Sequence, residues 1–213
     1  MASICVTIGA NFVHSYTPGA MYDLLRDHIA KRIELSDKEF SLAATFFAPK
    51  KLRKRQYLHQ EGDVARWIAF TSKGCLRCYS VDDAGTEHVV QFAVEDWWIA
   101  DLQSFLAGTP SHFAIDALED SELLLLDRAK REDLLKAIPK FERFFRLILE
   151  RNYVATNERI ACTLMASAED RYLAFLKSYP QFAQRVPQNQ IASYLGIAPE
   201  SLSRIRKDLS DKR

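Results

Sequence analysis

The sequence predicts an α+β protein: an N-terminal antiparallel β-roll of the jelly-roll type (a double-stranded β-helix), then one long helix, then a small domain of short helices. Three observations support this order. Residues 51–127 form short segments rich in Val, Ile, Phe, Tyr and Trp, separated by turn residues. Residues 140–167 contain neither Gly nor Pro. After residue 167, apolar residues recur with the spacing of short helices.

The bulk composition is that of a globular protein. The chain has 213 residues and a net charge of +1, and 48% of its residues are hydrophobic, which suits one large or two modest domains. Four cysteines are too few for a disulfide framework, so we expect a cytoplasmic protein. No apolar run is long enough to span a bilayer, and we expect no membrane partner. Charge is uneven, because residues 185–213 carry six basic and three acidic side chains. Any role in nucleic-acid binding must therefore come from local charge, such as the excess of +3 in that segment.

Regular patterning starts at Met21. Residues 1–20 show no helical or strand period, so we expect a disordered N-terminal extension and hypothesise that translation starts at Met21. The apolar start of the chain has no basic residue before it and does not read as a signal peptide. Residues 21–33 have helical spacing, and Ser36 with Glu39 forms a capping box that predicts a second, short helix.

The roll is predicted from seven short strands. Turn signals such as residues 61–63 and 82–85 contain a glycine, which permits the positive φ of a tight hairpin. Many short strands at regular spacing are typical of an antiparallel roll or barrel. The basic run at residues 50–55 falls on the first strand, and we interpret it as a solvated edge that discourages strand pairing. The expected strands span residues 52–59, 67–71, 75–81, 88–93, 97–100, 113–118 and 122–126.

The long helix carries an apolar row. A short helix over residues 128–138 ends before Pro139, and residues 140–167 continue as one helix. One seam with spacings of three and four is apolar except at Arg151 and Glu158. Two interpretations stay open: an ordinary buried helix, and a parallel helix pair across a homodimer. The seam consists of Phe144, Leu147, Arg151, Val154, Glu158, Ala161 and Met165.

The end of the chain has the pattern of a helix-turn-helix. Ser167 caps a helix that ends before Pro180. Further on, Gly196 stands where the turn needs a left-handed residue, and Pro199 opens the second helix, where its missing N–H is no loss. Ala192 is small enough for a close helix crossing, although a plain αα-hairpin is the alternative. The apolar anchors are Ile191, Leu195, Ile197, Leu202 and Ile205.

The polar side of this helix pair suits double-stranded DNA. A glutamate accepts a hydrogen bond from a cytosine amino group, and an arginine binds guanine through two hydrogen bonds. Serine, lysine and the amides at a helix start suit phosphates. We therefore expect a nucleic-acid interface at Gln188, Pro199, Glu200, Ser201, Ser203, Arg204 and Lys207.

From about residue 21 to its end, the chain resembles the bacterial Crp/Fnr superfamily of transcription regulators. Glu200 and Arg204 match the family's base-reading pair and Ser203 matches an Fnr-like serine, whereas Pro199 replaces an arginine that contacts DNA in some members. Most members continue into a β-hairpin wing, and we expect a variant without one.

The resemblance implies a dimeric, sequence-specific regulator that reads a pseudo-palindromic operator, with RNA polymerase as a further partner. It divides the chain into a cyclic nucleotide-binding-like sensor domain at 21–138, a dimerisation helix at 139–167 and a helix-turn-helix domain at 168–213.

The resemblance also locates an effector pocket. The cyclic-nucleotide version of the roll carries Gly-Glu-Leu and, about ten residues later, Arg-Ser/Thr-Ala. Here the matching stretches are residues 100–102 (Ala-Asp-Leu) and 111–113 (Ser-His-Phe), so a serine replaces the phosphate-binding arginine. A cyclic phosphate then lacks its cation, and we expect no control by cyclic AMP. An unidentified small-molecule effector and a plain aromatic core stay open as alternatives. The pocket residues are Trp97, Trp98, Asp101, Leu102, Phe105, Ser111 and His112.

We expect no metal, no cofactor and no enzymatic activity. Fnr-type sensors hold an iron–sulfur cluster with an N-terminal group of cysteines, and Cys5 stands alone there. Cys75 and Cys78 have metal-like spacing, but residues three apart on a strand point to opposite faces. A cupin-like enzyme needs a His-x-His pair, and the sequence has none, nor a P-loop or nucleophile elbow. The remaining rival is a ligand-binding sensor whose helical tail binds protein rather than DNA.

Overall fold

The computed structural model describes residues 18–211 of the chain. They form two compact units, the roll unit (residues 18–156) and the C-terminal unit (residues 157–211). Helix α5 (Lys140–Met165) runs through this division, and the domain boundaries expected near residues 138 and 167 stay predictions. Helix α1 (Pro18–Ala30) starts three residues earlier than the sequence predicts. The rest of the expected N-terminal extension lies outside the described residues.

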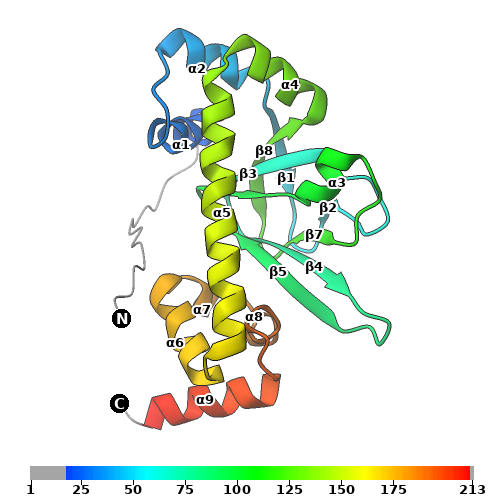
Figure 1. The fold of residues 1–213 in the computed structure, drawn as a ribbon, viewed down its shortest axis with the longest axis vertical. Helices are drawn as coiled ribbons and strands as arrows, with labels where there is room; N and C mark the ends of the chain where they lie inside the picture. The colour runs from blue at the N-terminus through cyan, green and yellow to red at the C-terminus, as the bar shows by residue number, and fades with distance from the viewer. Residues whose placement is uncertain (1–17, 212–213) are drawn as a thin grey trace. The chain divides into compact units, whose positions relative to one another are not determined.

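The roll unit contains the strands and the first helices (Figure 1). The capping box that predicts α2 is present, because Ser36 Oγ accepts from the Glu39 N–H (3.3 Å) and the Glu39 carboxylate accepts from the Ser36 N–H (2.8 Å). The strands are β1 (Ala48–Leu52), β2 (Tyr57–His59), β3 (Trp67–Lys73), β4 (Leu76–Val81), β5 (Glu87–Ala93), β6 (Trp97–Ile99), β7 (Ala114–Ala117) and β8 (Ser121–Asp127). The helices are α1, α2 (Asp37–Ala44), α3 (Leu102–Ala107), α4 (Arg128–Ala137) and the first part of α5.

The strands form two four-stranded sheets with the orders β1-β8-β3-β6 and β2-β7-β4-β5, and every neighbouring pair is antiparallel. The two sheets enclose a core in which Leu76, Ile99 and Leu123 are completely or almost completely buried. This arrangement confirms the antiparallel roll and the α+β class.

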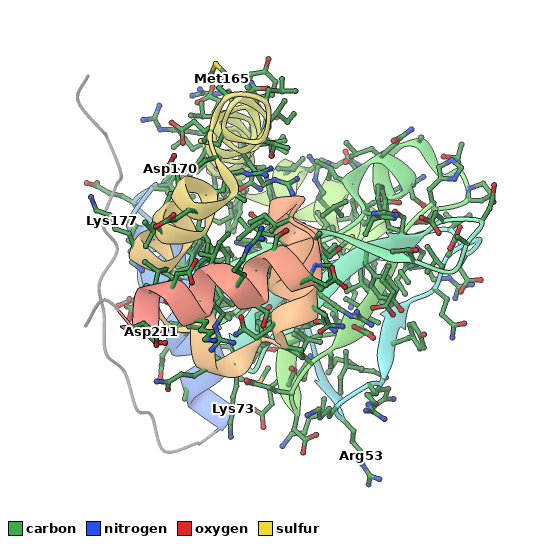
Figure 2. All side chains as sticks on the ribbon, turned by 90° about the horizontal axis from the view of Figure 1, so that it is seen from below. Arg53, Lys73, Met165, Asp170, Lys177 and Asp211 are labelled. Atoms are coloured by element: carbon green, nitrogen blue, oxygen red, sulfur yellow. The ribbon has the colours of Figure 1, made fainter. Side chains whose placement is uncertain are left out.

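The structure corrects the first predicted strand. Residues 52–59 do not form one strand, because β1 and β2 belong to different sheets and a corner at residues 53–56 joins them. Arg55 has a left-handed φ of 68°, and its N–H donates to Ala117 O at 2.7 Å. The Arg53 side chain points outwards from this corner (Figure 2). Residues 53–56 contain no glycine or proline that would favour a bend. The hydrogen bond to Ala117 of the distant strand β7 holds the corner instead.

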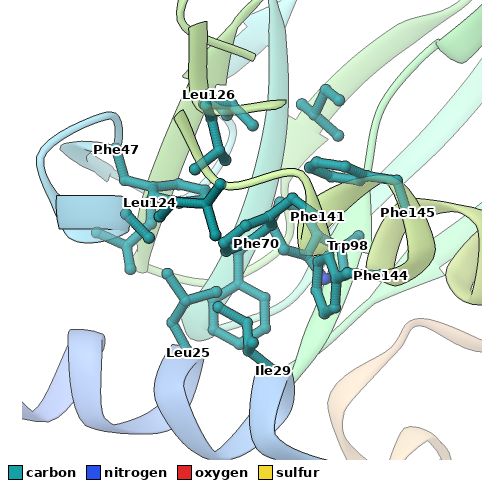
Figure 3. Packing of buried hydrophobic residues seen from close by; sticks show 14 of the residues in the cluster. Leu25, Ile29, Phe47, Phe70, Trp98, Leu124, Leu126, Phe141, Phe144 and Phe145 are labelled. Atoms are coloured by element: carbon teal, nitrogen blue, oxygen red, sulfur yellow. The ribbon is translucent and has the colours of Figure 1, made fainter. Parts of the chain in front are cut away.

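A second core lies outside the roll, between the sheet that contains β3 and helices α1, α2, α4 and α5 (Figure 3). Successive residues of β3 serve different cores: Phe70 points into this outer core and Ala69 into the roll. The first turns of α5 contribute Phe141, Phe144 and Phe145 to the outer core. Phe144 is therefore unavailable to a second copy of the chain, which corrects the predicted helix seam at its first residue.

The C-terminal unit contains α6 (Ala168–Ser178), α7 (Phe182–Arg185), α8 (Gln188–Leu195) and α9 (Pro199–Asp211). The predicted cap of α6 is present, since Ser167 Oγ accepts from the Asp170 N–H at 3.1 Å. Phe175 stacks on Phe182 with ring centroids 5.8 Å apart and lies 5.9 Å from Tyr194. These rings join α6, α7 and α8 and support the helix pair that follows.

Candidate nucleic-acid interface

One glycine sets the turn between α8 and α9. Gly196 has a φ of 63°, and its N–H donates to Ser193 O (3.1 Å) while the Ile197 N–H donates to Ala192 O (2.9 Å). These two hydrogen bonds form a Schellman motif, which satisfies the last carbonyl groups of α8. Pro199 is the first residue of α9, as the sequence predicts. The turn thus directs α9 away from the axis of α8.

Buried side chains hold the two helices together. Ile191 and Ala192 of α8 are completely buried and Leu202 of α9 almost completely, as the predicted anchors require. Helix α6 packs against both helices, and Arg171 Nη1 donates to Leu195 O at 3.0 Å. The position of α9 is therefore set by a packed apolar stripe and a capped neighbour.

The opposite face of α9 is open to solvent. Glu200, Arg204 and Lys207 are spaced by four and three residues, so they lie on one side of the helix. All three are exposed, and within residues 18–211 none of their side chains forms an ion pair or hydrogen bond. A helix of 13 residues is about 20 Å long, and an α-helix fits the major groove of DNA. This face can therefore present one acceptor and two cations to a duplex.

The other predicted interface residues differ in how far they are exposed to solvent. Pro199 and Ser203 are exposed, Ser201 is half-buried, and Gln188 is half-buried at the start of α8. The Gln188 Oε1 atom is buried and has no hydrogen-bond partner among the described residues. An amide in this state gains a partner if it turns towards a ligand. The sequence did not single out Arg206, which is also exposed on the flank of α9.

The two stretches that match the cyclic-nucleotide version of the roll, residues 100–102 and 111–113, lie side by side in the roll unit. In the described part of the chain, no arginine or lysine lines the cleft beside them. Asp101 caps α3 by accepting from the Ser104 N–H (3.1 Å), and Ser111 Oγ donates to Asp101 Oδ2 at 2.5 Å. Both side chains are buried. The sequence patterns predict no helix over Leu102–Ala107, where the structure has α3. A cleft of about 300 Å³ beside this pair is lined by Asp101, Gln103, Ser104, Thr109, Pro110, His112 and Phe113.

The two tryptophans do not share a pocket. Adjacent residues of a strand point to opposite faces, so Trp97 packs against the core inside the roll and Trp98 lies in the outer core. Leu102 also packs against the outer core, together with Phe105. The predicted effector pocket is therefore corrected: Trp98, Leu102 and Phe105 are core residues, and Asp101 with His112 lines the cleft.

Helix α5 exposes apolar side chains on two sides, and one of them includes Val154 and Met165 of the predicted seam. Leu147 and Ala161 are half-buried, Arg151 and Val154 are exposed, and Met165 projects into solvent at the end of the helix (Figure 2). Further exposed large apolar side chains follow a second line, on the opposite side of the helix. They are Leu149, Tyr153 (70% exposed), Ile160 and Leu164 (79% exposed), which we call the α5 stripe. Its spacing is also helical, and it contains no charged residue, whereas the predicted seam contains Arg151 and Glu158.

Two findings concern metal binding and membrane spans. In the part of the chain that the structure describes, no three His, Cys, Asp or Glu side chains lie close enough to hold a metal ion. Among the helices of residues 18–211, none combines the length and the apolar character that a membrane span requires. Cys75 and Cys78 are both buried, and burial raises the pKa of the Cys78 thiol to about 12.

The chain is similar in sequence to a known domain family and to bacterial regulatory proteins. Residues 49–137 match the cyclic nucleotide-binding domain family. The chain is 22% identical over 170 residues to transcriptional activator protein anr of Pseudomonas aeruginosa, covering 73% of this chain and 68% of that protein. It is 25% identical over 185 residues to regulatory protein HlyX of Actinobacillus pleuropneumoniae, covering 80% and 75%.

Solved structures share the fold. FixK2 from Bradyrhizobium japonicum aligns with a TM-score of 0.69 and 17% identity, covering 78% of this chain and 85% of that one. The c-di-GMP responsive global regulator CLP of Xanthomonas campestris aligns with a TM-score of 0.66 and 14% identity, covering 83% and 93%. At these identities the likeness is one of architecture.

Proposed function

The chain belongs to the Crp/Fnr superfamily of transcription regulators, and from this membership we propose that it is a dimeric regulator that binds double-stranded DNA in a sequence-specific way. Helix α9 is the recognition helix. Glu200 and Arg204 face base edges, and Ser201, Ser203 and Lys207 face phosphates. Gln188 and Pro199 stand at the starts of the two helices, where backbone N–H groups also meet phosphates.

The open polar face of α9 is the observation that carries this proposal. Glu200, Arg204 and Lys207 stand on the side opposite the buried Leu202, with no partner in the described chain. The buried stripe fixes the backbone of α9, so binding to a groove has to order these side chains but not the helix that carries them. The core of a protein-binding face is depleted in charged residues, whereas this face carries Glu200, Arg204 and Lys207.

We propose a homodimer through the α5 stripe. Leu149 and Tyr153 are large apolar side chains left in water, and the same helix continues the row with Ile160 and Leu164. Burying such a row against a second copy removes apolar area from water. Two recognition helices then enter successive major grooves about one helical turn apart, so the operator is a pseudo-palindrome.

We propose that cyclic AMP does not control the protein. Ser111 stands at the position that matches the family's phosphate-binding arginine, and its Oγ donates to the buried Asp101 carboxylate. A cyclic phosphate bound there would lack the cation that the family's arginine supplies. The effector, if the protein has one, is a different small molecule. We further propose that the protein is not an enzyme, carries no cofactor, acts in the cytoplasm and contacts RNA polymerase, since its relatives are named as transcriptional activators.

Selection from random duplex DNA, with and without cyclic AMP, tests the proposal. We expect one enriched pseudo-palindromic sequence whose enrichment is the same under both conditions. The matched control is the Arg204→Ala variant, which should lose enrichment at one base position of each half-site. No enrichment of any sequence would favour the protein-binding tail, and enrichment only with cyclic AMP would overturn the effector part.

A further inference from the structure

His28 is buried among aromatic rings and uses both of its ring nitrogens. Its side chain is 4% exposed, and its ring centroid lies 5.1 Å from that of Phe70 and 5.9 Å from that of Phe144. Nδ1 lies 2.7 Å from Asp96 Oδ1, and Nε2 accepts the indole N–H of Trp98 at 3.0 Å. Neither the proposed DNA contacts nor the proposed dimer contacts use this histidine.

These two partners fix the protonation of the imidazole. An indole nitrogen can only donate, so Nε2 carries no proton, and the single ring proton lies on Nδ1 and is donated to Asp96. A second proton would sit on Nε2 and face the Trp98 N–H across 3.0 Å. Two donors cannot share one hydrogen bond. Burial holds the pKa of His28 below its ordinary value, despite the nearby Asp96 carboxylate.

Trp98 connects His28 to the start of α5. Its ring meets those of Phe144 and Phe145 edge-on, at centroid distances of 6.1 Å and 6.2 Å. Trp98 is the second residue of β6 and lies two residues after Asp96, which has a left-handed φ of 71° in the β5–β6 turn. One imidazole from α1 is thus bonded to the turn and to the indole that packs on α5.

We propose that His28, oriented by Asp96, is a positioning residue: as a neutral imidazole it holds Trp98 against the first turns of α5, and its protonation releases that contact. The release of Trp98 does not depend on the proposed function. Its consequence does, because α5 carries the proposed dimer contact. His28 then links the pH of the surroundings to the packing of the dimer helix.

The charged groups around His28 mostly oppose a second proton. Lys31 and Arg32 of α1 are cations beside it: Lys31 Nζ binds Asp96 Oδ2 (2.8 Å), and Arg32 Nη1 donates to His28 O (2.7 Å). Arg151 of α5 adds a third cation, next to Arg32. Asp96 is the group that favours the proton. Protonation of His28 therefore requires acidic pH, and the Asp96 carboxylate raises the pH at which it occurs.

Indole N–H resonances of the full-length protein test the proposal, followed by NMR from about pH 8 to about pH 5. The chain has three tryptophans, and the Trp98→Phe variant assigns the signal of Trp98. We expect that signal to shift with one midpoint below about 6.5, while the signals of Trp67 and Trp97 do not follow it. A Trp98 signal that stays fixed, or three signals that move together, overturns the proposal.

Two variants separate positioning from simple stability. His28→Gln keeps an acceptor for Trp98 and cannot titrate, so the midpoint should disappear. Asp96→Asn tolerates the left-handed backbone and removes the favouring carboxylate, so the midpoint should move to lower pH. It serves as the test if His28→Gln does not fold, and an unchanged midpoint in Asp96→Asn refutes the role of Asp96.

Sedimentation measures the consequence for α5. The dimer dissociation constant of the unmodified chain should rise at least about fivefold between neutral and mildly acidic pH, and that of His28→Gln should not. A moving Trp98 signal with an unchanged dissociation constant refutes the coupling to α5. It leaves the DNA-binding proposal untouched, because operator selection at neutral pH tests that separately.

Discussion

Arg204→Ala should damage sequence reading and leave folding intact. Arg204 is exposed and has no ion pair or hydrogen bond within residues 18–211, so its removal should change the free energy of unfolding by less than about 0.5 kcal/mol. Losing a two-hydrogen-bond contact to guanine costs about 1–3 kcal/mol per helix. A dimer presents two such helices that do not touch at this position, so the losses add to about 2–6 kcal/mol for a symmetric operator. The dissociation constant should therefore rise between about 30-fold and about 10⁴-fold.

Lys207→Ala is the matched comparison, because Lys207 lies on the same face three residues away and is equally exposed. A phosphate contact carries no sequence information, so operator and random duplex should weaken by the same factor. The slope of log affinity against log salt should flatten by about 0.9 for each lost phosphate contact, and so by about 1.8 for the dimer. The assay is fluorescence anisotropy on both duplexes over a range of salt. If Arg204→Ala weakens random duplex as much as operator, or leaves the operator unaffected, its base-reading role is refuted.

Three further outcomes follow from the structure. In thermal or denaturant unfolding, Gly85→Ala should cost about 1 kcal/mol from left-handed backbone strain alone, because an added Cβ there meets nothing within 4 Å. Gly74→Ala should cost about 2–4 kcal/mol, since its Cβ would also lie 2.8 Å from a backbone oxygen; equal costs would contradict this. Tyr153→Glu should weaken the dimer at least tenfold in sedimentation, with Arg143→Glu, exposed elsewhere on α5, as its control. Hydrogen bonds from Lys140 and Ser36 hold the pKa of Glu39 at about 2, so the capping box should stabilise α2 above the ordinary pKa and be lost as pH falls towards 2; a carboxyl midpoint near 4 by NMR would refute this.

Local signals account for what the sequence predicted well. The turn of the helix pair depends on one glycine and one proline within four residues, and Gly196 and Pro199 adopt the predicted conformations because each residue's own backbone preferences suffice. The caps at Ser36 and Ser167 likewise involve partners three residues away. The open face of α9 follows from helical spacing once Leu202 is placed in the core.

Distant contacts account for what the sequence missed. The corner at Arg55 depends on a carbonyl at Ala117, and no local residue encodes that bend. The strand period predicts that Trp97 and Trp98 point to opposite faces. It does not predict the second core outside the roll, in which Trp98 is buried. Likewise, α5 offers two apolar rows with helical spacing, and the sequence does not show that Phe144, the first residue of one of them, is buried against the roll.

The sequence by itself therefore determined the order of the elements, the class of the fold and the register of the helix pair, because hydrophobic period, capping and turn chemistry act over a few residues. Only the tertiary structure decided which aromatic side chains fill the cores, that Phe144 is buried at the start of α5, and that a histidine of α1 accepts a hydrogen bond from the indole N–H of a tryptophan 70 residues away. Those features depend on which surfaces meet when the sheets close, and no short stretch of sequence holds both sides of such a contact.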